Sequence, residues 1–360
     1  MPADEWNALA GGQPFLRHEF LHALETAGCV GGRTGWLSQH LLLRRNGHLQ
    51  AALPLYIKHH SYGEYVFDWA WADAYARRGL RYYPKLVSAV PFTPVTGARL
   101  LGGSAGERAQ LVSAAVELAQ AMGASSWHCL FPSEAEAREI ASRGLLLRTG
   151  VQFHWGNAGY ATFDDYLAAM SHDKRKKIKQ ERRKVREAGV RFEHRVGPNI
   201  SQADWEFFER CYRGTYRAHH STPYLNLAFF KQLGRLLGEH CLLVIAHRDG
   251  ERMAAALNLF DGHALYGRYW GATQFVPGLH FETCYYQAIE FCIARGLARF
   301  EGGAQGEHKL ARGLLPVKTY SAHWLAHPEF AQAVERFLAQ EAGGVADYVD
   351  ELNERKPFKD

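Results

Sequence analysis

Apolar residues recur with a helical period in several stretches of the chain. In residues 104–122 they stand at Leu111, Ala114, Ala115, Leu118 and Ala121, which places them on one face of a helix. The same kind of spacing predicts helices over residues 163–188, 202–217, 227–237, 281–294 and 328–352. Gly189 and Gly296 follow two of these stretches, as is typical of the residue that ends a helix.

Two apolar runs, in residues 42–53 and 244–256, are each interrupted by a short turn signal. Asn46-Gly47 divides the first run and Asp249-Gly250 divides the second. Both pairs favour the type I′ turn, because its two central residues need positive φ. The sequence therefore predicts two β-hairpins.

An aromatic stretch with a period of two follows each hairpin. The large side chains are Tyr65, Phe67, Trp69 and Trp71 in the first stretch, and Tyr266, Arg268 and Trp270 in the second. A period of two predicts a strand with these side chains on one face. Each stretch leads to a Gly-Leu pair and then to a Tyr-Tyr pair, so the pattern repeats at a spacing of about 200 residues, typical of two related domains rather than a solenoid.

Hairpins mixed with helices in both halves predict an α/β or α+β fold. Short strands are also expected at residues 127–131 and from residue 298 onward. We place the first domain at residues 1–157, the second at 158–330 and a C-terminal helix at 331–360.

Composition excludes several classes of protein. The chain has 360 residues, 47% hydrophobic and 22% charged, which is typical of a globular protein and excludes wholesale disorder or a fibrous repeat. No run of about 18 apolar residues predicts a transmembrane helix, and residues 1–12 lack the apolar core of a signal peptide. We therefore expect a cytoplasmic protein. The six cysteines form no CxxC pair and are expected to be buried and free of metal.

One segment carries most of the positive charge. The whole chain has a net charge of +5, and residues 174–187 contain nine basic and two acidic residues. Apolar positions in this predicted helix are sparse, chiefly Ile178 and Val185, and like charges four residues apart destabilise a helix that has no anionic partner. We expect Lys176, Lys177, Arg182 and Arg183 to bind a phosphate-bearing ligand. Coenzyme A, nucleic acid and an anionic lipid headgroup all fit this pattern, and the alternative is a solvated helix face.

Two short motifs have simpler structural explanations. His18-Glu19-Phe20-Leu21-His22 matches a zinc-binding pattern, but it lies in an ordinary amphipathic helix and no metal site is expected. Residues 102–106 match the G-x-S-x-G nucleophile pattern, but Ser104 with Glu107 is also a capping box, which we favour.

A polar, glycine-rich segment at residues 301–320 follows a predicted strand. Glycines let the backbone approach a ligand closely, and Lys309 and Arg312 are three apart, on one face of a helical turn. We expect the segment to border the largest cleft, with Lys309 or Arg312 pointing into it.

Five motifs carry a family resemblance. They are Ser-Tyr-Gly-Glu-Tyr-Val-Phe-Asp at 61–68, Arg-Tyr-Tyr-Pro-Lys at 81–85, Pro-Phe-Thr-Pro-Val at 91–95, His-Phe-Glu-Thr-Cys-Tyr-Tyr-Gln at 280–287 and Glu-His-Lys-Leu-Ala-Arg-Gly at 307–313. The chain resembles, over nearly its whole length, the FemAB-like N-acyltransferases, bacterial proteins of the GNAT superfamily linked to peptidoglycan biosynthesis. The resemblance implies two tandem GNAT-like lobes, each a mixed, mostly antiparallel sheet flanked by helices.

The resemblance also implies a reaction. An amine, such as that of a cell-wall precursor, would take an acyl or aminoacyl group from acyl-CoA or aminoacyl-tRNA, with no tightly bound cofactor. The stretch at 274–280 that corresponds to the acyl-CoA pyrophosphate loop differs from Q/R-x-x-G-x-G/A in spacing and in its second glycine.

Residue roles follow from that reaction. An acyl transfer needs a base and an oxyanion donor. The base candidates are Glu282 and His308, and the oxyanion or phosphate candidates are Lys309 and Arg312. Tyr266, Arg268 and Trp270 are expected to line the acceptor cleft, with Glu301, Gln305 and His280 as further substrate-binding residues. The first lobe is expected to be mainly structural, and peripheral membrane contact is a possible partner interaction. The alternative is a non-catalytic protein that binds nucleic acid or anionic lipid on a GNAT-like scaffold.

Overall fold

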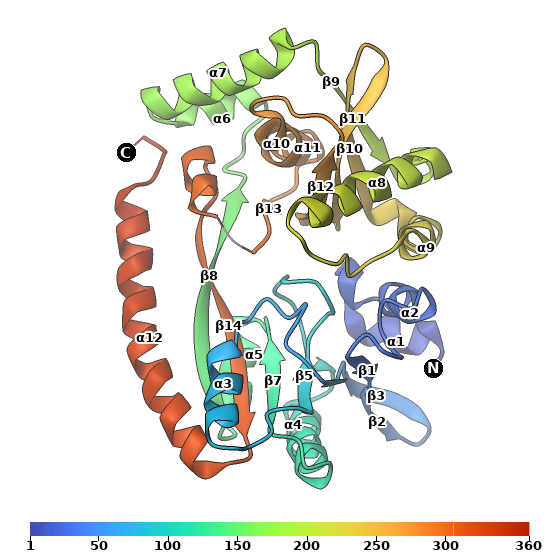
Figure 1. Ribbon diagram of the computed structural model, residues 1–360, viewed down its shortest axis with the longest axis vertical. Coiled ribbons are helices and arrows are strands. Elements are labelled where there is room, and N and C mark those ends of the chain that lie inside the picture. The colour runs from blue at the N-terminus through green and yellow to red at the C-terminus, as the bar shows by residue number, and fades with distance from the viewer. Residues whose placement is uncertain (305, 360) are drawn as a thin grey trace. The chain divides into compact units, whose positions relative to one another are not determined.

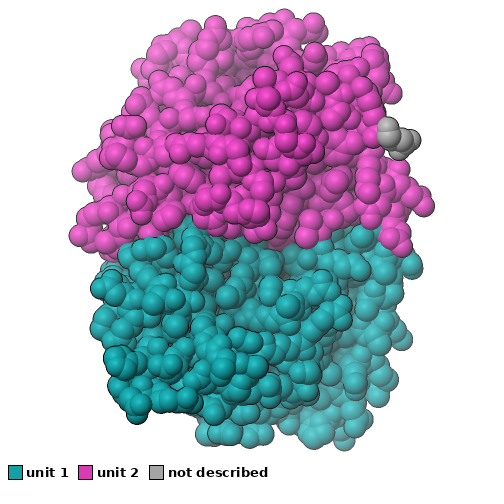
Figure 2. Space-filling model, turned by 180° about the vertical axis from the view of Figure 1, so that it is seen from behind, with its two compact units in different colours: residues 1–151, 318–349 teal, residues 152–317, 350–360 magenta. Residues whose placement is uncertain are grey.

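The computed structural model describes residues 1–304 and 306–359. The chain forms two compact units, coloured separately in Figure 2. Unit 1 comprises Met1–Val151 and Lys318–Val349, and unit 2 comprises Gln152–Val317 and Asp350–Asp360. The predicted boundaries at 157 and 330 therefore differ from this division. The physical reason lies in strand pairing, because Ser321 to Leu325 pair with the unit 1 strand at 126–130 and return the chain to unit 1.

Unit 1 is built from short strands and helices (Figure 1). Its helices are α1 (Ala3–Ala10), η1 (Pro14–Leu16), α2 (His18–Thr26), α3 (Trp69–Arg77), α4 (Ala105–Ala121) and α5 (Glu134–Ala141). Its strands are β1 (Trp36–Ser38), β2 (Leu41–Arg45), β3 (His48–Leu53), β4 (Tyr56–Lys58), β5 (Lys85–Ser88), β6 (Leu101–Gly102) and β7 (Ser126–Leu130). Strands β8 (Leu146–Gly156) and β14 (Leu315–Leu325) and helix α12 (Pro328–Glu354) contribute residues to both units.

The main sheet of unit 1 has the order β1-β4-β5-β7-β14. Only β5 and β7 in this series run parallel, with Val87 opposite His128. Helix α4 packs its apolar face on this core through Leu111 and Ala115. Ser104 caps α4 in the predicted capping box with Glu107, so the nucleophile motif is a helix start, as expected.

The first predicted aromatic strand is wrong. Residues 69–77 form helix α3, and Trp71 and Tyr75, four positions apart, share its buried face. Alanine alternates with the large residues from 70 to 76, and its high helix propensity overrides the period of two. The first hairpin is present, with positive φ at Asn46 and Gly47, but β2, β3 and β6 form a separate small sheet.

A buried ionic network fills the interior of unit 1. The Lys85 ammonium donates to Glu64 and to Ser61, each at 2.8 Å, and also contacts Asp68. The Tyr82 hydroxyl donates to Asp68 at 2.6 Å. Burial opposes the charge of Asp68, but Lys85 and His128 hold the pKa of this carboxyl well below its usual range. Lys85 is therefore the cation that holds two buried carboxylates together.

Unit 2 contains the predicted basic segment and the second hairpin. Its helices are α6 (Phe163–Ala169), α7 (His172–Glu187), η2 (Gly197–Asn199), α8 (Gln202–Ala218), α9 (Leu227–Leu237), η3 (Gly238–His240), α10 (Leu279–Phe281), the π-helical turn η4 (Glu282–Tyr286), α11 (Gln287–Arg295) and η5 (Glu307–Arg312). Its strands are β9 (Arg191–Val196), β10 (Cys241–Arg248), β11 (Glu251–Phe260), β12 (Ala264–Ala272) and β13 (Arg299–Glu301), with the end of β8.

The sheet of unit 2 has the order β8-β13-β12-β11-β10-β9. As in unit 1, one pair runs parallel, here β12 and β13, where Tyr266 stands opposite Glu301. The Asp249-Gly250 turn joins β10 to β11 as predicted. The predicted strand at 266–270 is confirmed within β12.

The predicted helix over 163–188 is divided. Met170 is extended (ψ 155°), which ends α6 and lets α7 begin at His172. Ile178 and Val185 are the buried residues of α7, as the sparse apolar pattern predicts. Among the described residues, no helix is both long and apolar enough to cross a membrane.

Candidate active site

The glycine-rich segment that follows β13 forms a tight 3-10 helix. Gly306 has φ 117° before η5, and Gly313 has φ 76° after it, so glycine is needed at both ends of the turn. Residues three apart nearly eclipse in a 3-10 helix. Lys309 and Arg312 therefore lie on one side of η5, as predicted, and both are buried.

Lys309 and Arg312 have different partners. The Lys309 ammonium donates to the Gly303 carbonyl at 2.9 Å, and it forms no ion pair with a described residue. Burial lowers the pKa of Lys309 to about 8. Arg312 pairs with Glu181 of α7 at 2.8 Å, and its guanidinium lies 3.4 Å from the centre of the Phe281 ring. Arg312 is thus held in place by an ion pair, whereas Lys309 is a buried cation that loses its proton more easily than an ordinary lysine.

Two histidines lie beside these cations. The His308 imidazole contacts the Tyr285 hydroxyl at 3.1 Å, and the rings of His280 and His308 are 6.3 Å apart. Burial, followed by the charges of Arg312 and Lys309, lowers the pKa of His308. Burial lowers the pKa of His280 to about 4. Both imidazoles are therefore neutral near pH 7 and able to accept a proton.

The predicted acceptor-binding residues occupy several environments. The Trp270 ring lies 4.6 Å from His280, which brings this part of β12 to the histidines. The buried Tyr266 hydroxyl donates to Asp261 at 2.8 Å, and the Arg268 guanidinium stacks on Tyr269. Burial raises the pKa of Glu301 to about 7, and Arg299 donates to this carboxylate. Gln305 lies outside the described residues.

Glu282 belongs to a different cluster. It begins the π-helical turn and is buried, and Arg182 of α7 donates to both of its carboxylate oxygens at 2.9–3.2 Å. Gln287 adds a further hydrogen bond at 2.8 Å, and Arg182 also pairs with Glu290. The geometry makes Glu282 a structural anchor for α7 and offers less support for its role as a base.

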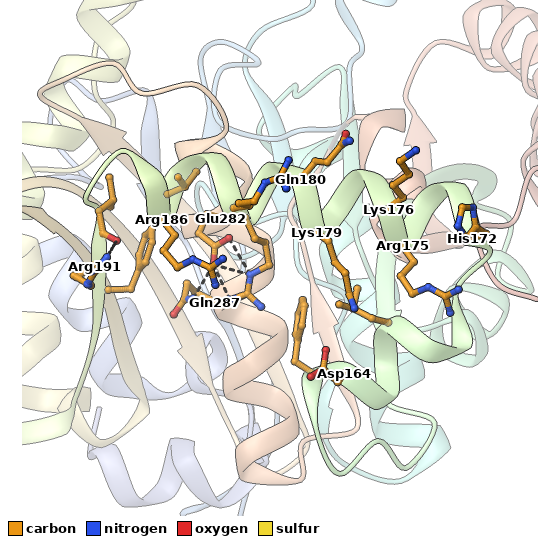
Figure 3. Close-up of a pocket in the computed structure, with 17 residues that line it drawn as sticks. Asp164, His172, Arg175, Lys176, Lys179, Gln180, Arg186, Arg191, Glu282 and Gln287 are labelled. Atoms are coloured by element: carbon orange, nitrogen blue, oxygen red, sulfur yellow. Dashed lines mark hydrogen bonds and ion pairs between the residues drawn. The ribbon is translucent and has the colours of Figure 1, made fainter.

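A cationic groove runs along α7. It has a volume of about 970 Å³, and α6, β9 and the start of the η4–α11 helix complete its wall (Figure 3). Seven arginines and lysines line it against two carboxylates, Asp164 and Glu282. The cations are Arg175, Lys176, Lys179, Arg182, Arg183, Arg186 and Arg191.

The groove along α7 is separate from the segment at 301–320. Neither Lys309 nor Arg312 lines this cavity; the basic helix lines it instead. The reason is that η5 turns both side chains inward, onto Gly303 and Glu181. Of the four predicted anion-binding residues, Lys176, Arg182 and Arg183 line the groove, whereas Lys177 is exposed outside its lining.

The predicted anion-binding set did not include Arg175, Lys179 and Arg186 of the groove. Their helical spacing of four and then seven residues is the signal that identifies one face of α7. Tyr285 was also missed as a partner of His308, since only the fold joins residues 23 positions apart.

No group of residues suited to hold a metal ion occurs in the part of the chain that the structure describes. In particular, the rings of His18 and His22 stack on each other on α2, 5.4 Å apart.

Known structures share this fold at low sequence identity. FemX superposes with a TM-score of 0.57 at 10% identity, covering 93% of this chain and 98% of that chain. A DUF2156 domain from Agrobacterium fabrum superposes with a TM-score of 0.57 at 12% identity, covering 94% of this chain and 95% of that chain. L-PGS from Bacillus licheniformis superposes with a TM-score of 0.53 at 10% identity, covering 89% of this chain and 96% of that chain. These likenesses show that the chain shares the fold of these proteins, and the predicted mixed α/β fold is confirmed.

A family model matches the whole of this chain. Among curated proteins, none matches this chain. The FemAB_like model, described as peptidoglycan biosynthesis/recognition, matches residues 1–360. The resemblance seen in the five sequence motifs is confirmed, and the chain belongs to the FemAB-like family.

Proposed function

We propose that this protein is an N-acyltransferase of cell-wall synthesis that takes an aminoacyl group from aminoacyl-tRNA and adds it to the amine of a peptidoglycan precursor. Its family supports an aminoacyl or acyl transferase in that process. The cationic groove along α7 is the observation that favours aminoacyl-tRNA as the donor.

The length of the groove favours a nucleic acid over a smaller phosphate ligand. Its lining positions on α7 run from 172 to 186, about 21 Å at 1.5 Å per residue. Successive phosphates of a strand are about 3.4 Å apart along the helix axis, so this length spans several nucleotides. Coenzyme A offers one diphosphate and one further phosphate, which would occupy a fraction of the seven cations.

The loop that would bind acyl-CoA gives little support to acyl-CoA as the donor. A second cavity of about 440 Å³ lies at residues 272–281, where β12 ends and α10 begins. Its lining contains no lysine or arginine, and its loop lacks the second glycine of the acyl-CoA pattern. We therefore favour aminoacyl-tRNA as the donor and keep acyl-CoA as the alternative to be tested.

The proposed chemistry uses the cluster around η5. The acceptor nitrogen attacks the ester carbonyl carbon, and a C–N bond forms while the carbonyl oxygen becomes an oxyanion. The bond between that carbon and the ribose oxygen then breaks. His308, neutral and hydrogen-bonded to Tyr285, takes the proton from nitrogen and returns it to the leaving ribose oxygen. Lys309 stabilises the oxyanion, and Arg312 holds the segment against α7.

The test is a transfer assay with purified protein. Radiolabelled aminoacyl-tRNA and radiolabelled acetyl-CoA are each incubated with a panel of cytoplasmic peptidoglycan precursors. We expect label to move from aminoacyl-tRNA to a precursor amine. Transfer from acetyl-CoA alone would replace the proposed donor, and RNA binding without any transfer would favour the non-catalytic alternative.

Removing two cations from the groove should weaken RNA binding in a salt-dependent way. We expect Lys179→Ala/Arg186→Ala to lower affinity for tRNA at low salt. The slope of log K against log salt should become shallower by about 1.4, since each lost contact with a single strand contributes about 0.7. Filter binding over a range of salt concentrations measures this slope.

A matched variant of the same helix controls for total charge. Lys177→Ala/Lys184→Ala also removes two exposed cations from α7, but neither side chain lines the groove. We expect this variant to keep the wild-type slope. Equal effects of the two variants would mean that the helix attracts RNA only through its overall charge.

A further inference from the structure

An apolar groove lies in unit 1, between α3 and the first turns of α12. It has a volume of about 510 Å³. Small or apolar side chains form most of its wall: Ala70, Trp71, Ala74, Phe330, Ala333, Val334 and Phe337. Figure 1 shows α3 and the start of α12 side by side.

The groove has a firm base. Tyr75 of α3 stacks on Phe330 of α12 with ring centres 4.0 Å apart. Trp71, Val334 and Leu338 are buried in the same core cluster. Because these contacts fix the two helices against each other, the groove is a built feature of unit 1 and does not depend on a side chain swinging aside.

Large exposed apolar side chains occur in the groove and on α3. Phe337 lines it and is 45% exposed, and Trp69 at the start of α3 is 39% exposed. The ring of Tyr62, itself 57% exposed, packs against Trp69 with centres 5.0 Å apart. An exposed phenylalanine in an apolar groove is typical of a binding surface.

Unpaired arginines occupy the end of α3. Arg77 and Arg78 line the groove and are exposed, and Arg81 is exposed three residues later. None of the three forms an ion pair or a side-chain hydrogen bond with the residues that the structure describes. Glu329 also lines the groove and is unpaired among those residues, which leaves an excess of positive charge at this end.

We propose that this face of unit 1 docks on the surface of an anionic phospholipid bilayer. The apolar groove with its exposed Phe337 would enter the boundary between headgroups and acyl chains, where apolar side chains of an amphipathic surface are buried. Arg77, Arg78 and Arg81 would contact lipid phosphates, which attract arginine at short range. A protein partner with an apolar segment would use the groove but would have no general need for three unpaired arginines.

This inference goes beyond the proposed transfer reaction. No residue of the candidate active site or of the α7 groove lines the groove of unit 1. Membrane docking can therefore be measured without any donor or acceptor, and its failure would leave the transfer proposal unaffected.

The experiment is co-sedimentation of the full chain with large vesicles at moderate salt. One set contains phosphatidylcholine alone, and the other contains equal parts of phosphatidylcholine and phosphatidylglycerol. We expect binding to the anionic vesicles and little to the neutral ones. Arg77→Glu/Arg78→Glu should weaken binding to the anionic vesicles at least about 25-fold, which is about fivefold for each arginine lost. Phe337→Gln should weaken it at unchanged charge.

Control variants separate the groove from general electrostatics. Arg33→Glu/Arg143→Glu reverses two other exposed arginines of unit 1, and Lys179→Ala/Arg186→Ala removes charge from α7. Both should keep most of the binding. Binding that is lost only in the α7 variant, or that is unaffected by Phe337→Gln, would overturn the proposal. So would a dimer in light scattering that Phe337→Gln dissociates, because a second copy of the chain would then cover the groove.

Discussion

Lys309→Ala should slow transfer about 100-fold while leaving donor binding nearly unchanged, because an oxyanion donor acts in the transition state and not on the bound donor. Single-turnover rates with saturating donor measure this effect. Lys309 donates to the Gly303 carbonyl and forms no ion pair with a described residue, so its charge is available to a developing anion. Lys318→Ala, which removes an exposed lysine, is the matched control and should keep the wild-type rate.

The pH dependence distinguishes the roles of this lysine. Burial lowers the pKa of Lys309 to about 8. If the protonated ammonium stabilises the oxyanion, its contribution is present below pH 8 and is lost as pH rises through that value. Lys309→Arg keeps its charge at all these pH values, so the rate ratio of wild type to this variant should fall between pH 7 and 9. A ratio that rises over this range would make Lys309 a base instead.

Lys85→Met should destabilise unit 1 by about 3–5 kcal/mol, the usual cost of removing one partner from a buried ionic cluster. Its ammonium is fully buried and contacts both Glu64 and Asp68, so the substitution leaves two buried carboxylates without this cation. Denaturant unfolding, followed by circular dichroism, measures the loss. A loss below about 1 kcal/mol would show that the network relaxes or takes up water.

A compensating variant tests the cause. Lys85→Met combined with Glu64→Gln and Asp68→Asn removes the carboxylate charges as well and should regain part of the stability. The pKa of Asp68 is depressed in the folded state. Its contribution to wild-type stability is therefore present above about pH 4 and is lost as pH falls further. Because the first lobe is predicted to be mainly structural, we also expect Lys85 variants that fold to retain turnover.

Local signals in the sequence determined much of the fold. The two type I′ turns depend on adjacent residues that accept positive φ, and the Ser104 cap depends on a partner three residues away. The helices over 105–121, 202–218 and 227–237 follow their apolar periods. The family motifs pointed to the whole architecture. The clustering of Lys309 and Arg312 on one side of a turn was also local and therefore predictable.

Only the tertiary structure decided what those side chains contact. Lys309 and Arg312 turn inward because the Gly303 carbonyl and the Glu181 carboxylate meet them. Arg182 and Glu282, 100 residues apart, form the pair that fixes α7 over the π-helical turn. A sequence pattern reports which face of an element is apolar or charged. The partner of that face is set by packing between distant segments, and this packing made one face of α7 a groove.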